Sequence, residues 1–140
     1  MLVNIVIDTN VIFVGLYSNR GSSFKLLSNI EHENFTIALS VPLLLEYEDV
    51  LVRNLNKLNL NRGDFDIFLD YLCKIADKRE IFYLWRPYLK DPKDDMILEL
   101  AVESDSNYII TFNEKHFAGI EKFKIRAINP GKFLNIMGII

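Results

Sequence analysis

The chain has 140 residues, of which half are hydrophobic and a quarter are charged, and this composition is typical of one folded globular domain spanning residues 1–140. Its net charge of −3 argues against a protein that holds nucleic acid by charge alone, but not against an enzyme that binds nucleic acid through metal ions. A single cysteine, no bilayer-spanning apolar run and no signal-peptide pattern exclude a disulfide framework and a membrane protein and predict a cytoplasmic location.

Strand and helix patterns alternate along the chain, which is typical of an α/β fold with a mostly parallel sheet. Strands are predicted at residues 2–7, 35–40, 81–85, 107–112 and 124–128. Helices are predicted at residues 10–17, 23–31, 40–54 and 64–78, from about Asp94, and at 130–137.

Polar side chains follow two of the predicted strands. Asp8 comes directly after the first strand, and Asn113 follows the fourth. Ligands of open α/β sheets collect at the carboxyl ends of parallel strands, so both residues are candidates for a binding site. Each also has a simpler explanation, because Asp8 suits a turn and Asn113 suits the cap of a short helix.

The helix at residues 40–54 offers two further carboxylates. Its apolar stripe includes Leu43 and Tyr47, and Glu46 and Glu48 lie on opposite margins of that stripe. Asp49 faces away from it. Helical periodicity therefore leaves Glu46 and Glu48 as rivals for a place in the site, and a solvent-exposed helix margin explains either one equally well.

The helix that starts near Asp94 offers another candidate carboxylate. Asp94 shares a face with Ile97, Leu98 and Ala101, whereas Asp95 lies nearly opposite this apolar arc. An inward-facing acid costs free energy unless it is paired, and a divalent metal ion is one such partner. We expect Asp95 to be only a favourable charge near the helix N-terminus, and capping of the helix is the alternative role of Asp94.

The remaining reactive residue types indicate no other chemistry. His32 and His116 lack metal-ligand spacing and are expected to be structural, and Cys73 lies in the apolar pattern of its helix. The sequence contains no nucleophile elbow, phosphate-binding loop or dinucleotide fingerprint. Carboxylates that converge on one sheet edge are the ligands that Mg²⁺ and Mn²⁺ prefer.

Four blocks of sequence carry a resemblance to a known family. They read "IVIDTNVIF", "LSVPLLLEYEDVL", "KDPKDDMILELAVESDSNYIITFNEKHF" and "NPGKFL". In this order and spacing they resemble PIN-domain proteins, and among these the toxin components of toxin–antitoxin systems, the VapC-like ribonucleases. The resemblance covers nearly the whole chain. It implies a three-layer α/β/α sandwich with a central, mostly parallel sheet, and an endoribonuclease activity that depends on Mg²⁺ or Mn²⁺.

The resemblance also assigns roles to single residues. It implies that Asp8, Glu46 and Asp94 hold the metal, and it favours Glu46 over Glu48. Asn113 stands where many relatives carry a fourth catalytic acid, so one bound ion and two bound ions both stay open. Residues expected to orient ligands or water around the site are Asn10, Ser40 and Thr111.

Several side chains near the strand ends are candidates for contacts with RNA. The basic candidates for phosphate contacts are Arg20, Lys90, Lys93 and Lys115. The aromatic candidates for base stacking are Tyr17, Phe112 and Phe117, for which core packing is the alternative.

The neutral Asn113 leaves a second function open, a catalytically weakened PIN fold that binds RNA or protein. A phosphotransfer domain with Asp8 as nucleophile is disfavoured, because "DTNVI" lacks a second aspartate at the required spacing. The expected partners are an RNA substrate, a cognate antitoxin and a second copy of the chain. The early helices offer a docking face at Phe13, Leu16 and Phe24, which suits an antitoxin, a homodimer or the core.

Overall fold

The computed structural model describes residues 2–139 and contains one five-stranded sheet with strand order β3-β2-β1-β4-β5. Every neighbouring pair of strands is parallel, as the alternation of strand and helix patterns predicts. The strands are β1 (Val3–Ile7), β2 (Phe35–Leu39), β3 (Asp77–Lys78), β4 (Tyr108–Ile110) and β5 (Arg126–Ile128).

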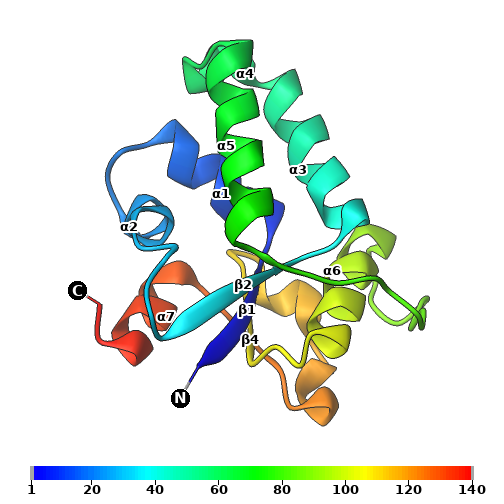
Figure 1. The fold of residues 1–140 in the computed structure, drawn as a ribbon. Coiled ribbons are helices and arrows are strands. Elements are labelled where there is room, and N and C mark those ends of the chain that lie inside the picture. Colours follow the sequence, from blue (N-terminus) through cyan, green and yellow to red (C-terminus); the bar gives the residue numbers. More distant parts are fainter. Residues whose placement is uncertain (1, 140) are drawn as a thin grey trace.

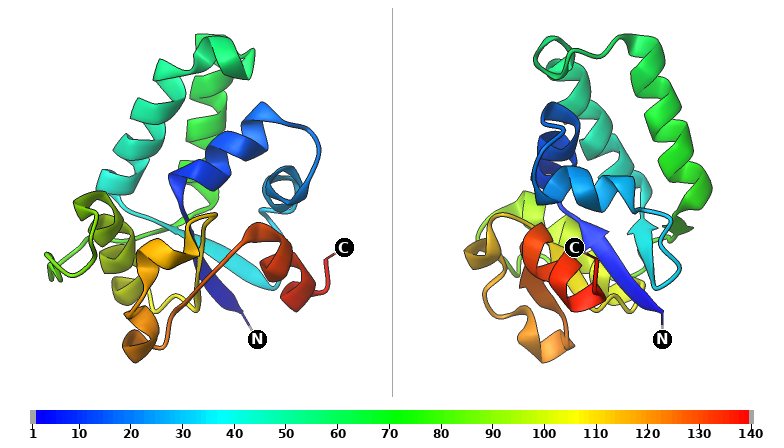
Figure 2. Two further views of the ribbon diagram at one scale, coloured as in Figure 1. Left: turned by 180° about the vertical axis from the view of Figure 1, so that it is seen from behind. Right: turned by 90° about the vertical axis from the view of Figure 1, so that its left-hand side faces the viewer.

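Helices lie on both faces of the sheet, as in a three-layer sandwich. In Figure 1, α2 and α7 lie to the left of the central strands, α6 lies to the right, and α3, α4 and α5 rise above them. The left-hand view of Figure 2, seen from behind, shows α7 and α6 on opposite sides of the central strands. The helices are α1 (Thr9–Tyr17), α2 (Ser22–Ser28), α3 (Val41–Arg53), α4 (Leu55–Leu58), α5 (Arg62–Ile75), α6 (Pro92–Glu103), α7 (Pro130–Met137), and the 3-10 turns η1 (Glu114–Phe117) and η2 (Ile120–Phe123).

Burial of apolar side chains explains the central position of β1 and β4. Ile5, Val6 and Ile7 are at most 1% exposed, and Ile109 and Ile110 are fully buried. A strand covered by helices on both faces is apolar at consecutive positions rather than at alternate ones. None of the helices in residues 2–139 has the length and apolar character needed to cross a bilayer.

The prediction of a strand at residues 81–85 is wrong. The third strand is the two-residue β3, which lies earlier in the chain and pairs with Ala38 and Leu39 of β2. β2 ends at Leu39, so the chain beyond β3 has no strand left to pair with. Phe82 is 78% exposed there, which shows that this aromatic run lies on the surface. A short, charged strand is typical of a sheet edge.

The expectation for Asp95 is also wrong, because this residue is only 1% exposed. Its carboxylate accepts hydrogen bonds from the backbone N–H groups of Tyr88 (3.3 Å) and Leu89 (2.8 Å). One turn later, the buried Glu99 accepts from Trp85 N at 2.9 Å. The segment before α6 therefore covers a second face of the helix, a contact that the helical wheel does not reveal.

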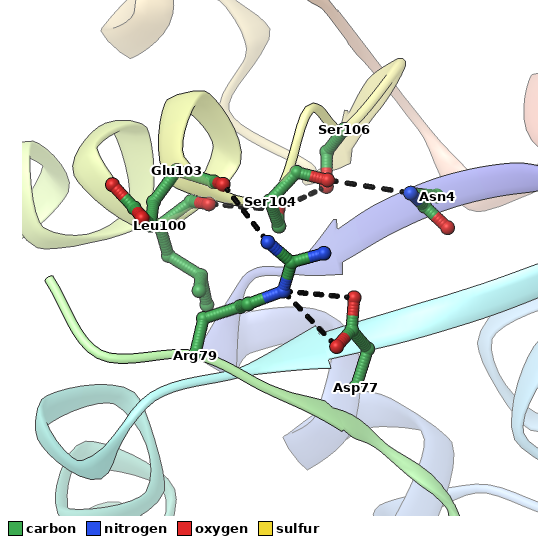
Figure 3. A network of polar contacts seen from close by, with 7 residues as sticks. All are labelled: Asn4, Asp77, Arg79, Leu100, Glu103, Ser104 and Ser106. Atoms are coloured by element: carbon green, nitrogen blue, oxygen red, sulfur yellow. Dashed lines mark hydrogen bonds and ion pairs between the residues drawn. The ribbon is translucent and has the colours of Figure 1, made fainter.

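The carboxyl end of α6 is fixed to the sheet by a polar network (Figure 3). Arg79, just after β3, donates to the Asp77 carboxylate at 3.1 Å and to the carbonyl of Glu103 at 3.3 Å. The buried Ser104 shares a 2.7 Å hydrogen bond with Ser106. These contacts, together with those of Asp95 and Glu99, hold α6 at both ends.

Candidate metal and nucleic-acid site

The carboxyl ends of β1 and β4 meet where the strand order changes direction. From β1 the chain continues to β2 and β3 on one side, and β4 and β5 lie on the other side. Open α/β sheets bind ligands at such a switch point. Asp8 follows β1 and Thr111 follows β4, and the N–H of Asp8 donates to the carbonyl of Ile110 at 2.9 Å. The topology therefore places Asp8 at the position in the sheet best suited to a ligand.

Asp8 is held there by a hydrogen-bonded side chain. The Thr111 hydroxyl donates to Asp8 Oδ2 at 2.7 Å, and it accepts from the N–H of Asn113 at 3.0 Å. Burial raises the pKa of the Asp8 carboxyl, and the hydrogen bond from Thr111 opposes this increase. The negative charge of Glu46 raises the pKa of Asp8 further. Asp8 is thus a buried acid whose orientation is fixed from the neighbouring strand.

Asp94 lies in the first turn of α6, where Asp91 caps the helix by accepting from Lys93 N at 2.9 Å. Asp94 is 8% exposed, and its Oδ2 has no hydrogen-bond partner among the described residues. Burial raises the pKa of Asp94 to about 6, and the charges of Asp8 and Asp91 add to this effect. The imidazole of His116 opposes the increase, since its Nδ1 lies 3.4 Å from Asp94 Oδ2. Capping therefore does not explain Asp94, and His116 is the one cationic group that the structure places against its carboxylate among the described residues.

A cavity of about 400 Å³ brings these side chains together. Asp8, Asp94 and Glu46 all line it, whereas Glu48 does not. Of the two rival glutamates on α3, Glu46 is therefore the one that lines the cavity. The lining residues are Asp8, Thr9, Asn10, Phe13, Glu46, Val50, Asn54, Asp91, Lys93, Asp94, Asn113 and His116.

The side chains predicted to orient ligands differ in their position relative to the cavity. Asn10 lines the cavity, and its Oδ1 is buried without a partner among the described residues. Thr111 lies behind Asp8 and hydrogen-bonds to it. Ser40 does not line the cavity, because its Oγ accepts from Leu43 N at 3.3 Å and caps α3. Ser40 is thus the N-cap of α3, and its role around the site stays a prediction.

Sequence reasoning missed His116, which lines the cavity beside Asp94. The spacing between the two histidines is uninformative here, since the residues that line this cavity come from separate elements. The useful signal was the position of His116 after the fourth strand, three residues beyond Asn113.

The structure places the candidates for RNA contacts in different environments. Of the basic candidates, Lys93 lines the cavity. Among the aromatic candidates, Tyr17 is 60% exposed and Phe112 is 44% exposed, so both can meet a ligand. Phe117 is 1% exposed and belongs to the core.

The donor atoms around the cavity fit a hard divalent cation. Carboxylate and amide oxygens predominate, and the buried Asp94 Oδ2 and Asn10 Oδ1 both lack partners among the described residues. In the conformation described for residues 2–139, no three His, Cys, Asp or Glu side chains stand close enough together to hold an ion. Glu46 is partly exposed and reaches this cavity from α3.

A family model for the PIN domain matches residues 4–115, which include Asp8, Glu46, Asp94 and Asn113. The chain belongs to the PIN-domain family. This PIN domain has the fold of a chain in the crystal structure of VapBC2 from Rickettsia felis bound to a DNA fragment from their promoter. The two chains are 18% identical with a TM-score of 0.61, and the alignment covers 89% of the PIN domain and 98% of the other chain. No curated protein sequence matches the PIN domain significantly.

Proposed function

We propose that this PIN domain is a divalent-metal-dependent endoribonuclease and acts as the toxin of a toxin–antitoxin pair. The observation that carries the proposal is the meeting of Asp8 and Asp94, 86 positions apart in the sequence, at one cavity with raised carboxyl pKa values. Acids whose pKa values are raised by burial and by a neighbouring negative charge are typical of functional sites. Membership of the PIN-domain family supports the same conclusion.

In this proposal Asp8, Glu46 and Asp94 hold Mg²⁺ or Mn²⁺. The bound ion lowers the pKa of water and offsets negative charge on the scissile phosphate, which is its contribution to phosphodiester hydrolysis. Thr111 keeps the Asp8 carboxylate in position through its 2.7 Å hydrogen bond.

Other residues of the cavity handle the substrate. Lys93, at the start of α6, supplies a positive charge for an RNA phosphate. Asn113 presents a neutral amide, which accepts or donates a hydrogen bond without adding to the repulsion between the acids.

The antitoxin is the part of the proposal that rests on likeness of fold. The structure with the same fold is that of VapBC2 bound to promoter DNA. We therefore propose that this PIN domain binds a small antitoxin protein. Co-purification with the product of an adjacent reading frame tests this, and a chain that purifies alone when both are expressed together contradicts it.

Cleavage of a labelled, structured RNA in the presence of Mn²⁺ tests the catalytic proposal. We expect cleavage by the wild type and by the control variant Asp49→Asn, whose side chain lies on the exposed face of α3. Chelation with EDTA and the substitution Asp8→Asn should each reduce cleavage to background. Cleavage that survives Asp8→Asn would rule out this site.

A binding module with a weakened site is the second candidate, because the neutral Asn113 adds no negative charge to the cavity. This candidate predicts RNA retention without cleavage in the same assay. The substitution Asn113→Asp then distinguishes the two functions, since an added carboxylate should strengthen metal binding and restore cleavage only if the rest of the site is competent.

A further inference from the structure

His116 stands apart from the other cavity residues because it is a nitrogen donor among oxygen donors. It lies in η1, directly after β4, and its side chain is 54% exposed. The only other histidine of the chain, His32, precedes β2 and lies at the amino ends of the strands, away from the cavity. Its ring stacks on Phe35 at 5.8 Å. The lining of this cavity therefore includes a single imidazole, and that imidazole is partly exposed.

The contact between His116 and Asp94 is close, but it is longer than an ordinary hydrogen bond. His116 Nδ1 lies 3.4 Å from Asp94 Oδ2, and this oxygen is buried without a hydrogen-bond partner among the described residues. Two ligand atoms about 2.1 Å from one ion lie roughly 3.0–3.4 Å apart at octahedral to tetrahedral angles. The separation observed here is thus one that two ligands of a shared ion adopt.

The chemistry of the donors distinguishes one metal from another. Mg²⁺ binds oxygen almost exclusively, whereas affinity for an imidazole nitrogen increases from Mn²⁺ to Co²⁺ and Ni²⁺. Asn113 brings no charge to the same side of the cavity. An imidazole in this place therefore supplies a ligand that favours transition-metal ions.

We infer that His116 is a ligand of the metal held by Asp8 and Asp94, and that it makes the site prefer Mn²⁺ or Co²⁺ over Mg²⁺. This inference rests on the proposed function, because it concerns the metal of the same site. It adds a ligand and a metal preference to that proposal.

The opposing explanation is that His116 is only a neighbour of the Asp94 carboxylate. In that case its removal changes the affinity for every divalent ion by the same factor, because nothing in a purely electrostatic contact distinguishes Mn²⁺ from Mg²⁺. The ratio of the two affinities therefore separates a ligand from a neighbour.

The experiment uses the untagged full chain, since a histidine tag would add imidazoles. Pulsed electron paramagnetic resonance of bound Mn²⁺ detects a coupled ¹⁴N nucleus, and calorimetry measures the dissociation constants of Mn²⁺ and Mg²⁺. Wild type is compared with His116→Ala and with the matched control His32→Ala, and the melting temperature of each variant checks that it is folded.

We expect a nitrogen coupling in wild type and in His32→Ala, and its loss in His116→Ala. Affinity for Mn²⁺ should fall by about tenfold or more in His116→Ala, while affinity for Mg²⁺ changes little. Bound Mn²⁺ without nitrogen coupling, or an equal loss of affinity for both ions, would overturn the role of His116 and leave the nuclease proposal standing. A wild type that binds no Mn²⁺ would overturn both.

Discussion

At the scale of the residue, one hydroxyl organises the centre of the candidate site. Thr111 donates to Asp8 Oδ2 and accepts from the N–H of Asn113, so it connects the ends of β1 and β4. It is fully buried, and no solvent can replace it. A buried acceptor or donor left without its partner is costly, which makes this residue a sensitive point for both stability and geometry.

Replacement of Thr111 by valine tests that role. Thr111→Val keeps the branched shape but removes both hydrogen bonds, and we expect a loss of about 1–3 kcal/mol in the free energy of unfolding. RNA cleavage should fall by about 10–100-fold, because the Asp8 carboxylate is no longer fixed. Thr36→Val, on β2 and outside the cavity, is the control and should leave cleavage unchanged. Full activity in Thr111→Val would show that Asp8 needs no orientation.

Asp94 provides a prediction on pH. Its pKa is raised from 3.8 in the unfolded chain to about 6 in the folded protein. The stability that the protonated carboxyl contributes is therefore fully present below the unfolded value and is lost as the pH rises through about 6. In metal-free protein the ionised Asp94 therefore destabilises the folded state at neutral pH.

Urea unfolding in the presence of EDTA measures this effect on the free energy of unfolding. We expect Asp94→Asn to be more stable than wild type by roughly 1–2 kcal/mol at about pH 7.5, and the difference to shrink towards pH 4. The control variant Asp49→Asn, which alters an exposed carboxylate, should show no such pH dependence. A difference between Asp94→Asn and wild type that stays constant across this range would contradict the assignment.

At the scale of the element, α6 is the helix whose placement matters most. Its first turn carries Asp94 and its second face is anchored by Asp95 and Glu99 to the segment before it. Arg86 from that segment donates to Glu99 through Nε at 3.1 Å. Since Glu99 is 2% exposed, the guanidinium of Arg86 offsets the cost of burying its carboxylate.

Removal of the guanidinium tests the anchor. Breaking a buried ion pair costs about 3–5 kcal/mol, and since the Arg86 side chain is 47% exposed we expect Arg86→Ala to lie near or below the lower end of this range. Arg53→Ala breaks the exposed pair with Asp49 on α3 and should cost only about 0.3–0.5 kcal/mol. Equal losses in the two variants, measured by chemical denaturation, would show that the anchor adds nothing.

At the scale of the whole molecule, the sheet order brings together parts of the chain that are far apart in sequence. β1 pairs with both β2 and β4, so that Asp8, Glu46 and Asp94 reach one cavity from three separate elements. Clustered carboxylates repel one another in the absence of a cation. A bound ion that contacts all three carboxylates should therefore stabilise the folded state.

Thermal melting with increasing Mn²⁺ measures this coupling. The melting temperature of the wild type should rise with the ion concentration, and a ligand at 100 times its dissociation constant adds about 2.7 kcal/mol. Asp8→Asn should abolish the increase, whereas Asp49→Asn should retain it. A wild-type melting temperature that is insensitive to Mn²⁺ would count against the metal site.

The sequence alone pointed to most of the acidic residues proposed for the site, but not to the residues that pack around them. Asp8 and Asp94 were found because each breaks an apolar pattern that one helix or strand defines alone. The buried Asp95 and Glu99 were not found, because a helical wheel shows only one apolar face and carries no information on a segment that packs against another. His116 was passed over for the same reason, since its neighbour Asp94 belongs to a different element.

By itself, the sequence determined the alternation of strands and helices, the parallel sheet and the strand ends that carry polar side chains. These follow from local periodicity and from the burial that apolar residues require. Only the tertiary structure decided that β3 lies at Asp77–Lys78 and that His116 meets Asp94. Each of these depends on where a neighbouring element ends or packs, and such long-range contacts leave no periodic trace in the chain.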